Sequence, residues 1–381
     1  MKMRIMLATE WLPPDIGGVA RHVDDLAKKL SERGHKVAVI TRKKRRINKH
    51  YEVYEIDKLN YLRIFSGIRT NFPIRRILKN FEPDIVHSHH AFTPIPLFAL
   101  RAAKNLNLPT ILTNHSAYFY EYNYILKTLG YIGFPFKTFI EKSDAIISVS
   151  KISANFIQQF APRKRILIIP NGVDVNHFRP IHKKDDDSEF VILFVSRIVR
   201  RKGLHLLVES LRYLKKDIPN IKLVIVGEGT FEEYIRRRVY DLDLKKNVKF
   251  MGKIKDKELP AVYNNADLFV LPSLYGESFG IVVLEAMASG VPVIVSNIGG
   301  LKEIVNNLVD GILLEKNNPK EIYEKIMILY KNPDLRRYLS KNARRKVEEK
   351  YDWNKIICNI EKIYIEILEE KKYPLLYSKN M

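Results

Sequence analysis

The chain of 381 residues contains a single cysteine, Cys358, which excludes an intrachain disulfide framework and a zinc site built from cysteines. It also lacks any uncharged apolar run approaching the roughly 18 residues that a membrane-spanning helix needs. The first predicted strand begins almost at Met1, so no secretory leader is expected. These absences together predict a cytoplasmic protein in a reducing compartment.

Acidic residues are too few to balance the basic ones. The chain has 43 Asp and Glu against 65 Lys and Arg, which gives a net charge of +22. This excess excludes an acidic solvating protein and indicates anionic partners, such as nucleotide phosphates, nucleic acid or a lipid headgroup surface.

Short apolar runs alternate with helical patterns along almost the whole chain. A charged stretch over 178–189 interrupts this alternation and indicates a solvated linker. Strands that alternate with helices predict mostly parallel sheets covered on both faces, and the interruption favours two doubly wound α/β domains of similar size. The strands are predicted at 4–8, 36–41, 84–88, 109–113, 145–149 and 166–169, and then at 191–195, 222–226, 248–251, 268–271, 291–295 and 311–314.

In open α/β sheets, ligands lie beyond the carboxyl ends of the strands. Two such domains facing each other would enclose a deep interdomain cleft. The candidate site residues are therefore the polar residues that follow the predicted strands.

The stretch 276–286 offers a phosphate site between two carboxylates. A helix is predicted to start near Gly280, where unpaired amides favour a diphosphate. Glu277 precedes this helix, and Glu285 lies about 7–8 Å along its axis. Sugar, diphosphate and ribose would fit this order, because each carboxylate can accept hydroxyl hydrogen bonds. Two surface glutamates near a helix start are the alternative, and this stretch alone leaves both open.

Two cations follow the predicted strand 191–195. Arg197 and Lys202, with Gly203 leading into a helix, would neutralise a departing diphosphate. The alternative is plain basic surface, since Arg200 and Arg201 lie alongside.

Gly17 and Gly18 lie between the first strand and its helix, where they would let the backbone approach a phosphate or sugar closely. A simple tight turn explains them equally well. The pair is not a GxGxxG fingerprint, so a nicotinamide or flavin cofactor is not supported.

Histidines follow two further strands. His87, His89 and His90 come after a strand at 84–86, and His115 comes after 109–113. They would form an acid–base pair or a metal site, but the absence of a nearby carboxylate set disfavours a metal. His115 is the better candidate for contacting a sugar or acceptor hydroxyl, whereas His87 and His90 are predicted to be structural.

Cations are interleaved with bulky apolar residues over 42–77. This composition suits an anionic membrane face, and a solvated helix and loop is the alternative. No RNP-type strand, zinc finger or recognition helix supports nucleic acid, so no nucleic-acid partner is predicted.

Taken in order, these motifs resemble those of the GT-B glycosyltransferases of family four, and the resemblance covers nearly the whole chain. One departure is Ser196, where many members carry glycine before the arginine, a small change that should leave Arg197 usable. Within the family, residues 84–92 resemble the catalytic subunits of phosphatidylinositol N-acetylglucosaminyltransferases. The motifs are Gly17-Gly18, Thr113-Asn114-His115, Pro170-Asn171-Gly172-Val173-Asp174, Arg197 with Lys202-Gly203, Val226-Gly227-Glu228-Gly229, and Glu277 with Glu285.

The resemblance implies an acceptor-binding Rossmann-like domain over 1–175 and a nucleotide-sugar-binding one over 176–352, with a final helix over 353–381 packing back on the first. It also implies a retaining transferase that uses a nucleotide-diphosphate sugar, with UDP preferred, and needs neither a metal nor another cofactor. By this analogy Gly17 and Gly18 approach the donor phosphates, and His115 lines the sugar site.

The same analogy gives roles to the second domain. Arg197 and Lys202 would hold the diphosphate, and Glu285 would bind the ribose. Glu277 would bind hydroxyls of the transferred sugar. Backbone groups complete the implied donor site, from Phe279 and Gly280 toward the sugar and from Lys253 and Ile254 toward the base.

The leading hypothesis is therefore a transferase that moves a hexosyl or N-acetylhexosaminyl group to a hydroxyl of a lipid-linked or phospholipid-type acceptor, peripherally on the cytoplasmic membrane face. One alternative is a soluble transferase that makes a storage or compatible-solute sugar. An alternative of another class is a protein that binds a nucleotide-sugar or nucleic acid without turnover.

Overall fold

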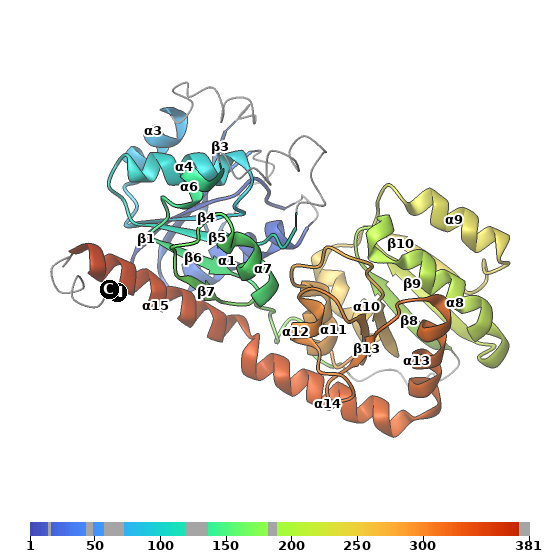
Figure 1. The fold of residues 1–381 in the computed structure, drawn as a ribbon. Helices are drawn as coiled ribbons and strands as arrows, with labels where there is room; N and C mark the ends of the chain where they lie inside the picture. Colours follow the sequence, from blue (N-terminus) through green and yellow to red (C-terminus); the bar gives the residue numbers. More distant parts are fainter. Residues whose placement is uncertain (14–16, 43–48, 57–71, 119–135, 182–188, 373–381) are drawn as a thin grey trace. The chain divides into compact units, whose positions relative to one another are not determined.

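The computed structural model describes residues 1–13, 17–42, 49–56, 72–118, 136–181 and 189–372. The chain forms two compact units, one comprising Met1–Asn171 with Asn354–Met381 and the other comprising Gly172–Trp353. Each unit is an α/β fold built on one parallel sheet, which confirms the predicted fold class (Figure 1).

The first unit contains a seven-stranded sheet in the order β3-β2-β1-β4-β5-β6-β7. The order reverses between β1 and β4, which pair directly, and in open α/β sheets ligands bind beyond the carboxyl ends of the strands at such a reversal. The strands are β1 (Arg4–Ala8), β2 (Lys36–Thr41), β3 (Glu52–Glu55), β4 (Ile85–His89), β5 (Thr110–Asn114), β6 (Ala145–Ser148) and β7 (Ile166–Ile168).

Helices of the first unit pack against this sheet. Ser150 caps α7, because its side chain accepts a hydrogen bond from the Ser153 amide at 3.2 Å. Pro94 opens α4, at a position whose amide would have no intrahelical partner. The described helices of this unit are α1 (Gly18–Glu32), α3 (Phe72–Phe81), α4 (Pro94–Lys104), α6 (Phe136–Ile140), α7 (Lys151–Gln158) and α15 (Trp353–Lys372).

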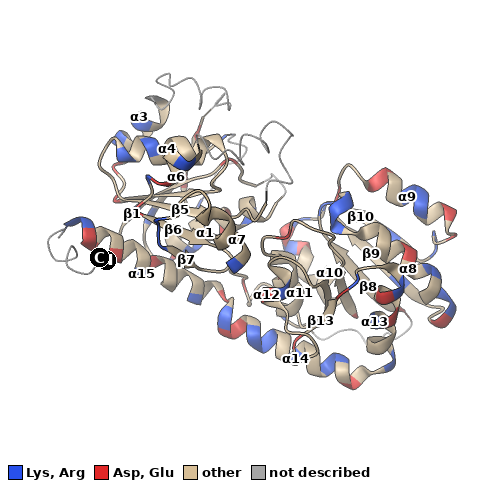
Figure 2. Ribbon diagram, viewed as in Figure 1, with Lys and Arg blue, Asp and Glu red and all other residues tan. Residues whose placement is uncertain are grey.

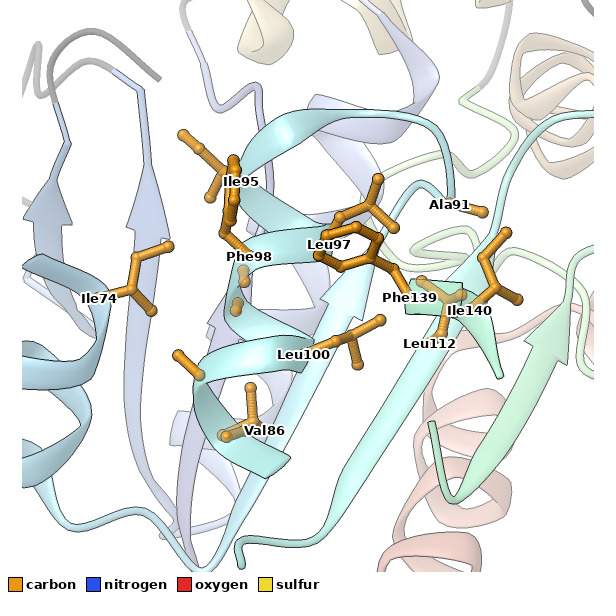
Figure 3. Close-up of a cluster of buried hydrophobic side chains, with 14 of the residues drawn as sticks. Ile74, Val86, Ala91, Ile95, Leu97, Phe98, Leu100, Leu112, Phe139 and Ile140 are labelled. Atoms are coloured by element: carbon orange, nitrogen blue, oxygen red, sulfur yellow. The ribbon is translucent and has the colours of Figure 1, made fainter. Parts of the chain in front are cut away.

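A hydrophobic core lies between α4 and the sheet strands beneath it (Figure 3). Phe98 of α4, Val86 of β4 and Leu112 of β5 are fully buried. Truncating a buried phenylalanine to alanine costs about 3–5 kcal/mol, so this core contributes much of the stability of the first unit. It anchors β4 and β5, the strands that carry the histidines.

The second unit contains a six-stranded sheet in the order β10-β9-β8-β11-β12-β13. Here the order reverses between β8 and β11, which pair directly. The strands are β8 (Phe190–Val195), β9 (Ile221–Val226), β10 (Val248–Gly252), β11 (Leu268–Leu271), β12 (Val293–Ser296) and β13 (Ile312–Leu314).

Helices also cover the second sheet (Figure 1). Two short 3-10 turns, Arg200–Lys202 and Asp256–Glu258, follow β8 and β10. The described helices are α8 (Leu204–Asp217), α9 (Glu232–Asp241), α10 (Leu259–Asn264), α11 (Ile281–Ala288), α12 (Leu301–Ile304), α13 (Pro319–Lys331) and α14 (Pro333–Lys350).

The change of unit falls at Gly172, slightly before the boundary at 175 predicted from the sequence. A side chain at Gly172 would crowd the Trp353 ring, with a Cβ only 2.6 Å from it. The amide of Val173 also donates to the carbonyl of Tyr351 at 2.8 Å. These contacts tie residues after Asn171 to the junction of α14 and α15. From Asn354 onward, α15 belongs to the first unit.

Two details of the sheets differ from the sequence analysis. β3 was not predicted, because this short strand has two exposed and two half-buried residues and so lacks a strong apolar run. β4 extends to His89, so His87 and His89 both lie within the strand, and the expectation that they follow a strand ending at residue 86 was wrong. Both histidines are completely buried.

Charged residues are distributed over helices of both units, and Figure 2 shows basic and acidic positions side by side on α9 and α14. Most of the basic segment over 42–77 lies outside the described residues, so the membrane-facing hypothesis attached to it stays a prediction. None of the described helices combines the length and low charge that a membrane crossing requires.

Candidate functional site

The site of the second unit forms where the loops after β8 and β11 meet. Gly203 has a φ of 70°, and a Cβ there would overlap the carbonyl oxygen of Pro272. The amide of Leu274 donates to the carbonyl of Arg201 at 2.7 Å. Glycine is therefore required at this turn both by its backbone conformation and by the close approach of the second loop.

Lys202 and Glu277 form a buried ion pair at this junction. The Lys202 Nζ donates to Glu277 Oε1 at 2.5 Å, although the two residues are 75 positions apart in the chain. Ser273 Oγ donates to the same carboxylate oxygen at 2.5 Å. Both Lys202 and Glu277 are more than nine-tenths buried. The structure therefore brings together two of the residues that the sequence analysis selected.

The charges around the pair explain its ionisation. Burial raises the pKa of Glu277, but the charge and hydrogen bond of Lys202, the hydroxyl of Ser273 and the charge of Arg201 together lower this pKa below its usual value. Burial lowers the pKa of Lys202, and the charges of Arg201 and Arg197 lower it further, against the opposing effect of Glu277. Glu277 is thus a carboxylate at neutral pH.

Positive charge exceeds negative charge in this cluster. Arg201 lies 3.9 Å from Glu277 Oε1 and donates to the carbonyl of Gly276 at 3.1 Å. Arg197 follows β8 and is exposed. Three cations therefore accompany one carboxylate at the carboxyl ends of β8 and β11, an arrangement that suits a polyanion such as a diphosphate.

The start of α11 completes this edge of the site. Gly280 is its N-cap, with a φ of 122°, and a Cβ there would lie 2.6 Å from the Leu301 side chain. Phe279 is buried beside it. The Gly300 amide donates to the carbonyl of Glu277 at 2.9 Å, so the loop after β12 holds the acidic residue in place.

Glu285 lies one turn inside α11 and is buried. Its carboxylate accepts a hydrogen bond from the Tyr263 hydroxyl of α10 at 2.7 Å. A carboxylate offers about four acceptor positions, so this bond orients the group without using its whole capacity.

Lys253 and Ile254 directly follow β10 at the same edge of the sheet. Gly252 has a φ of 60°, and the Lys253 amide lies 3.4 Å from the Glu228 carboxylate. Lys253 is exposed and Ile254 is half-buried. β10 lies two strands from β8, so this turn is further from the charged cluster than the loop of β11.

In the first unit, Gly17 and Gly18 mark the start of α1 and are exposed. A Cβ at Gly17 would meet nothing within 4 Å, so packing within the described residues does not demand glycine there. The ligand approach and the tight turn considered from the sequence therefore both stay open for this pair.

The histidines occupy different environments. His87 is bound on both ring nitrogens, by the Tyr364 hydroxyl at 2.7 Å and by Thr113 Oγ1 at 2.6 Å, which supports a structural role. His115, at 7% exposure, follows β5, and its Nε2 lies 3.4 Å from His89 Nδ1. Burial holds the pKa of His115 well below its usual value.

Sequence reasoning missed several residues that support these groups. Ser273 and Tyr263 orient Glu277 and Glu285, and neither belongs to a motif that spacing reveals. Glu10, two residues after β1, is also buried, accepts a hydrogen bond from the Ile95 amide at 3.3 Å and pairs with Arg42 at 3.3 Å. A carboxylate in an apolar stretch directly after a strand was the only available signal for Glu10.

Two family models match the chain, one to each half. Glycosyltransferase Family 4 matches residues 16–177, and Glycosyl transferases group 1 matches residues 175–346.

Curated relatives agree with these matches. A glycosyltransferase of Methanocaldococcus jannaschii is 31% identical over 96% of this chain and 99% of its own length. A glycogen synthase of Mycobacterium tuberculosis is 25% identical over 98% of this chain and 97% of its own. The Arabidopsis thaliana relative, one component of a phosphatidylinositol N-acetylglucosaminyltransferase, is 25% identical over 98% of this chain and 84% of its own.

Among solved structures, the Anabaena protein HepE in complex with UDP-glucose is similar in fold. It has a TM-score of 0.79 and 20% identity, over 96% of this chain and 100% of that one. The parallel sheets, the cations after β8 and the carboxylates around α11 agree with the sequence matches, and the chain belongs to the group 1 glycosyltransferases of GT-B fold.

Proposed function

We propose that this glycosyltransferase moves a hexosyl or N-acetylhexosaminyl group from a UDP-sugar to a hydroxyl of a lipid-linked acceptor, with retention of anomeric configuration and without a metal. The observation that carries the proposal is the Lys202–Glu277 pair, with Arg197 and Arg201 beside it, at the point where the strand order of the second unit reverses.

The donor diphosphate is assigned to Arg197 and Lys202. Because three cations accompany one carboxylate there, the cluster can neutralise the charge that develops on the leaving diphosphate. That charge compensation is the task a divalent metal performs in other transferases, which supports metal-independent transfer. The amide dipoles before α11, near Phe279 and Gly280, add to it.

The acidic groups are assigned to the two ends of the donor. Glu277 is an ionised carboxylate beside the diphosphate site, suited to accept hydrogen bonds from sugar hydroxyls. Glu285, oriented by Tyr263, is assigned to the ribose. Lys253 and Ile254 are assigned to the base through their backbone groups. In the first unit, Gly17 and Gly18 are assigned to donor phosphates and His115 to the transferred sugar.

The proposed reaction proceeds on one face of the sugar. The bond from the anomeric carbon to the donor phosphate oxygen breaks, and the acceptor oxygen forms the new bond from the same side. The acceptor proton passes to the departing phosphate oxygen, whose charge Arg197 and Lys202 hold. No described carboxylate is assigned to a covalent intermediate, since Glu277 is engaged by Lys202 and Ser273.

A UDP donor and a lipid-linked acceptor are supported by the similar proteins. HepE is described in complex with UDP-glucose, and the Arabidopsis relative is named for transfer of N-acetylglucosamine to phosphatidylinositol. The net charge of +22 suits an anionic lipid surface. The glycogen synthase relative favours the second candidate, a soluble transferase that extends or makes a storage sugar.

The test measures transfer by the full-length chain in EDTA from UDP-N-acetylglucosamine, UDP-glucose and GDP-mannose. The acceptors are vesicles that contain phosphatidylinositol or diacylglycerol and, separately, soluble glucans. We expect transfer from a UDP-sugar to lipid, with an α-linked product in the nuclear magnetic resonance spectrum. Transfer only to glucans would establish the second candidate. No transfer and no donor hydrolysis would leave a binding protein.

A further inference from the structure

Three histidines from three elements of the first unit converge on one point. His22 lies in α1, His89 ends β4, and His115 follows β5. Each offers one ring nitrogen, and these nitrogens all lie within 4.8 Å of one another. All three side chains are buried, at 4%, 0% and 7% exposure. The sequence analysis did not include His22, because a single histidine inside a helix carries no spacing signal.

The neighbouring His87 shows how a structural histidine is satisfied here. Both of its ring nitrogens have short hydrogen bonds, to Tyr364 and Thr113. His89 differs: its Nδ1 has only the 3.4 Å contact with His115, and its Nε2 has no hydrogen-bond partner among the described residues. A buried polar nitrogen without a partner is costly, so His89 is better explained by a ligand than by the fold.

The spacing of the nitrogens fits a metal ion. Imidazole nitrogens bind zinc at about 2.0–2.1 Å in tetrahedral geometry, which places two ligand nitrogens roughly 3.3–3.4 Å apart. The ligand nitrogens of the triad all lie within 4.8 Å of one another, so side-chain rotations that shorten a separation by at most about 1.4 Å bring them to this spacing.

We propose that His22, His89 and His115 form a binding site for a divalent transition ion of the zinc class. Three imidazoles without a carboxylate or thiolate favour zinc, cobalt, nickel or copper and disfavour magnesium and calcium, which prefer oxygen ligands. Three protein ligands leave a fourth position for water or a substrate atom.

The ion would act as an inhibitor rather than as part of the chemistry, and this consequence rests on the proposed function. His22 lies four residues after Gly18, about 6 Å along the helix from the end assigned to donor phosphates. An ion held by His115 occupies a ring nitrogen of the residue that is assigned to the transferred sugar. Zinc and donor sugar should therefore compete.

The experiment measures zinc binding by full-length protein that has been dialysed against EDTA. We expect one ion per chain, and X-ray absorption of the bound zinc should show three imidazole nitrogens at about 2.0 Å. His22→Gln and His89→Gln should each weaken binding by at least about 100-fold. His205→Gln is the matched control, because His205 is a half-buried histidine of the second unit and lies outside the triad. It should bind zinc like the unmodified chain.

The wild-type spectrum decides the question even if a variant fails to fold. If zinc does not bind stoichiometrically, or if the scattering shell lacks three imidazoles, the metal site is overturned. The proposed transferase function would not be affected, because the transfer assay tests it separately. Another outcome is that zinc binds as expected without any change in the KM of the donor as zinc is added. That result would support the metal site and overturn the competitive inhibition. If zinc still inhibits a folded His22→Gln variant, the claim that zinc inhibits by binding to the three histidines is also overturned.

Discussion

Burying the charges of Lys202 and Glu277 costs the protein free energy. Removing two charges from water costs several kcal/mol per ion, and such pairs are often no more stabilising than apolar residues of the same volume. The pair is retained with a hydroxyl, Ser273, and a further cation, Arg201, around one carboxylate oxygen. This arrangement is better explained by ligand binding than by stability.

Lys202→Met removes the cation but keeps most of the side-chain volume. We expect UDP affinity to fall by tenfold or more, because the diphosphate loses its buried partner. The free energy of unfolding should also fall by about 3–5 kcal/mol, since Glu277 is left without its closest counterion. Isothermal titration calorimetry and urea denaturation measure the two effects.

The double variant Lys202→Met with Glu277→Gln separates these effects. We expect it to recover part of the lost stability, because neither charge remains, but not the affinity for UDP. Lys216→Met, at an exposed position of α8, should change stability by no more than about 0.5 kcal/mol. Unchanged UDP binding in Lys202→Met would refute the diphosphate assignment.

Glu285→Gln tests the ribose assignment with a pair of ligands. The unmodified chain should bind UDP about tenfold more tightly than 2′,3′-dideoxy-UDP, because the carboxylate accepts ribose hydroxyls. In Glu285→Gln this preference should shrink to about twofold. If the variant keeps the full preference, the ribose contacts lie elsewhere.

At the scale of elements, the turns after the strands decide where the site residues lie. The turn before α8 carries Gly203 against the loop after β11, and α15 carries Tyr364 against β4. Gly203 thereby sets the position of the adjacent Lys202, and Tyr364 sets the position of the His87 ring.

Gly203→Ala should be far more damaging than Gly252→Ala, although both glycines have similar positive φ values, 70° and 60°. A Cβ at Gly203 overlaps the backbone of Pro272, whereas at Gly252 the nearest atom, in Glu228, is 3.6 Å away. We expect Gly252→Ala to cost about 1–2 kcal/mol, from backbone conformation alone. Gly203→Ala should exceed this cost by at least about 2 kcal/mol. Equal midpoints in urea would contradict the close-approach argument.

Tyr364→Phe removes the hydroxyl that binds His87 and keeps the buried ring. Stability should fall by about 1–3 kcal/mol, because a buried histidine nitrogen loses its partner. Tyr338→Phe, at an exposed position of α14, is the matched control and should change stability by less than about 0.5 kcal/mol. Equal stability of the two variants would show that the bond between α15 and β4 contributes nothing.

At the scale of the whole molecule, acid should destabilise the protein through its buried histidines. Burial lowers the pKa of His22 and of His87 to about 3, against 6.5 in the unfolded chain. The unfolded state therefore binds more protons between pH 3 and 6.5, and stability falls as pH falls through that window. At pH 5 each histidine should cost about 2 kcal/mol relative to pH 7.

Urea denaturation between pH 7.5 and pH 5 measures this loss. His87→Gln should reduce the dependence on pH by about the contribution of one histidine, whereas His205→Gln should change it much less, because His205 is only half-buried. A flat profile in the unmodified chain would show that the histidines are protonated without unfolding.

Much of the fold follows from local sequence patterns. Apolar runs of strand length separated by helical periods predict parallel α/β units, because each run must be covered on both faces. The sequence also shows which residue types follow each predicted strand. For this reason Arg197, Lys202, Glu277 and Glu285 could be predicted as site residues from the sequence alone. β3 escaped this reasoning, because a short, half-exposed edge strand has little apolar signal.

Only the tertiary structure decided which of these residues touch. The bond between Lys202 and Glu277 joins positions 75 residues apart, and it exists because β8 and β11 are neighbours in the sheet. The spacing of residues along the chain does not reveal the order of the strands in the sheet. The same reason hides His22 from sequence analysis, since a residue inside a helix joins His89 and His115 only when α1 packs near the ends of β4 and β5. Local periodicity determined the elements of this protein, and long-range pairing of strands decided its sites.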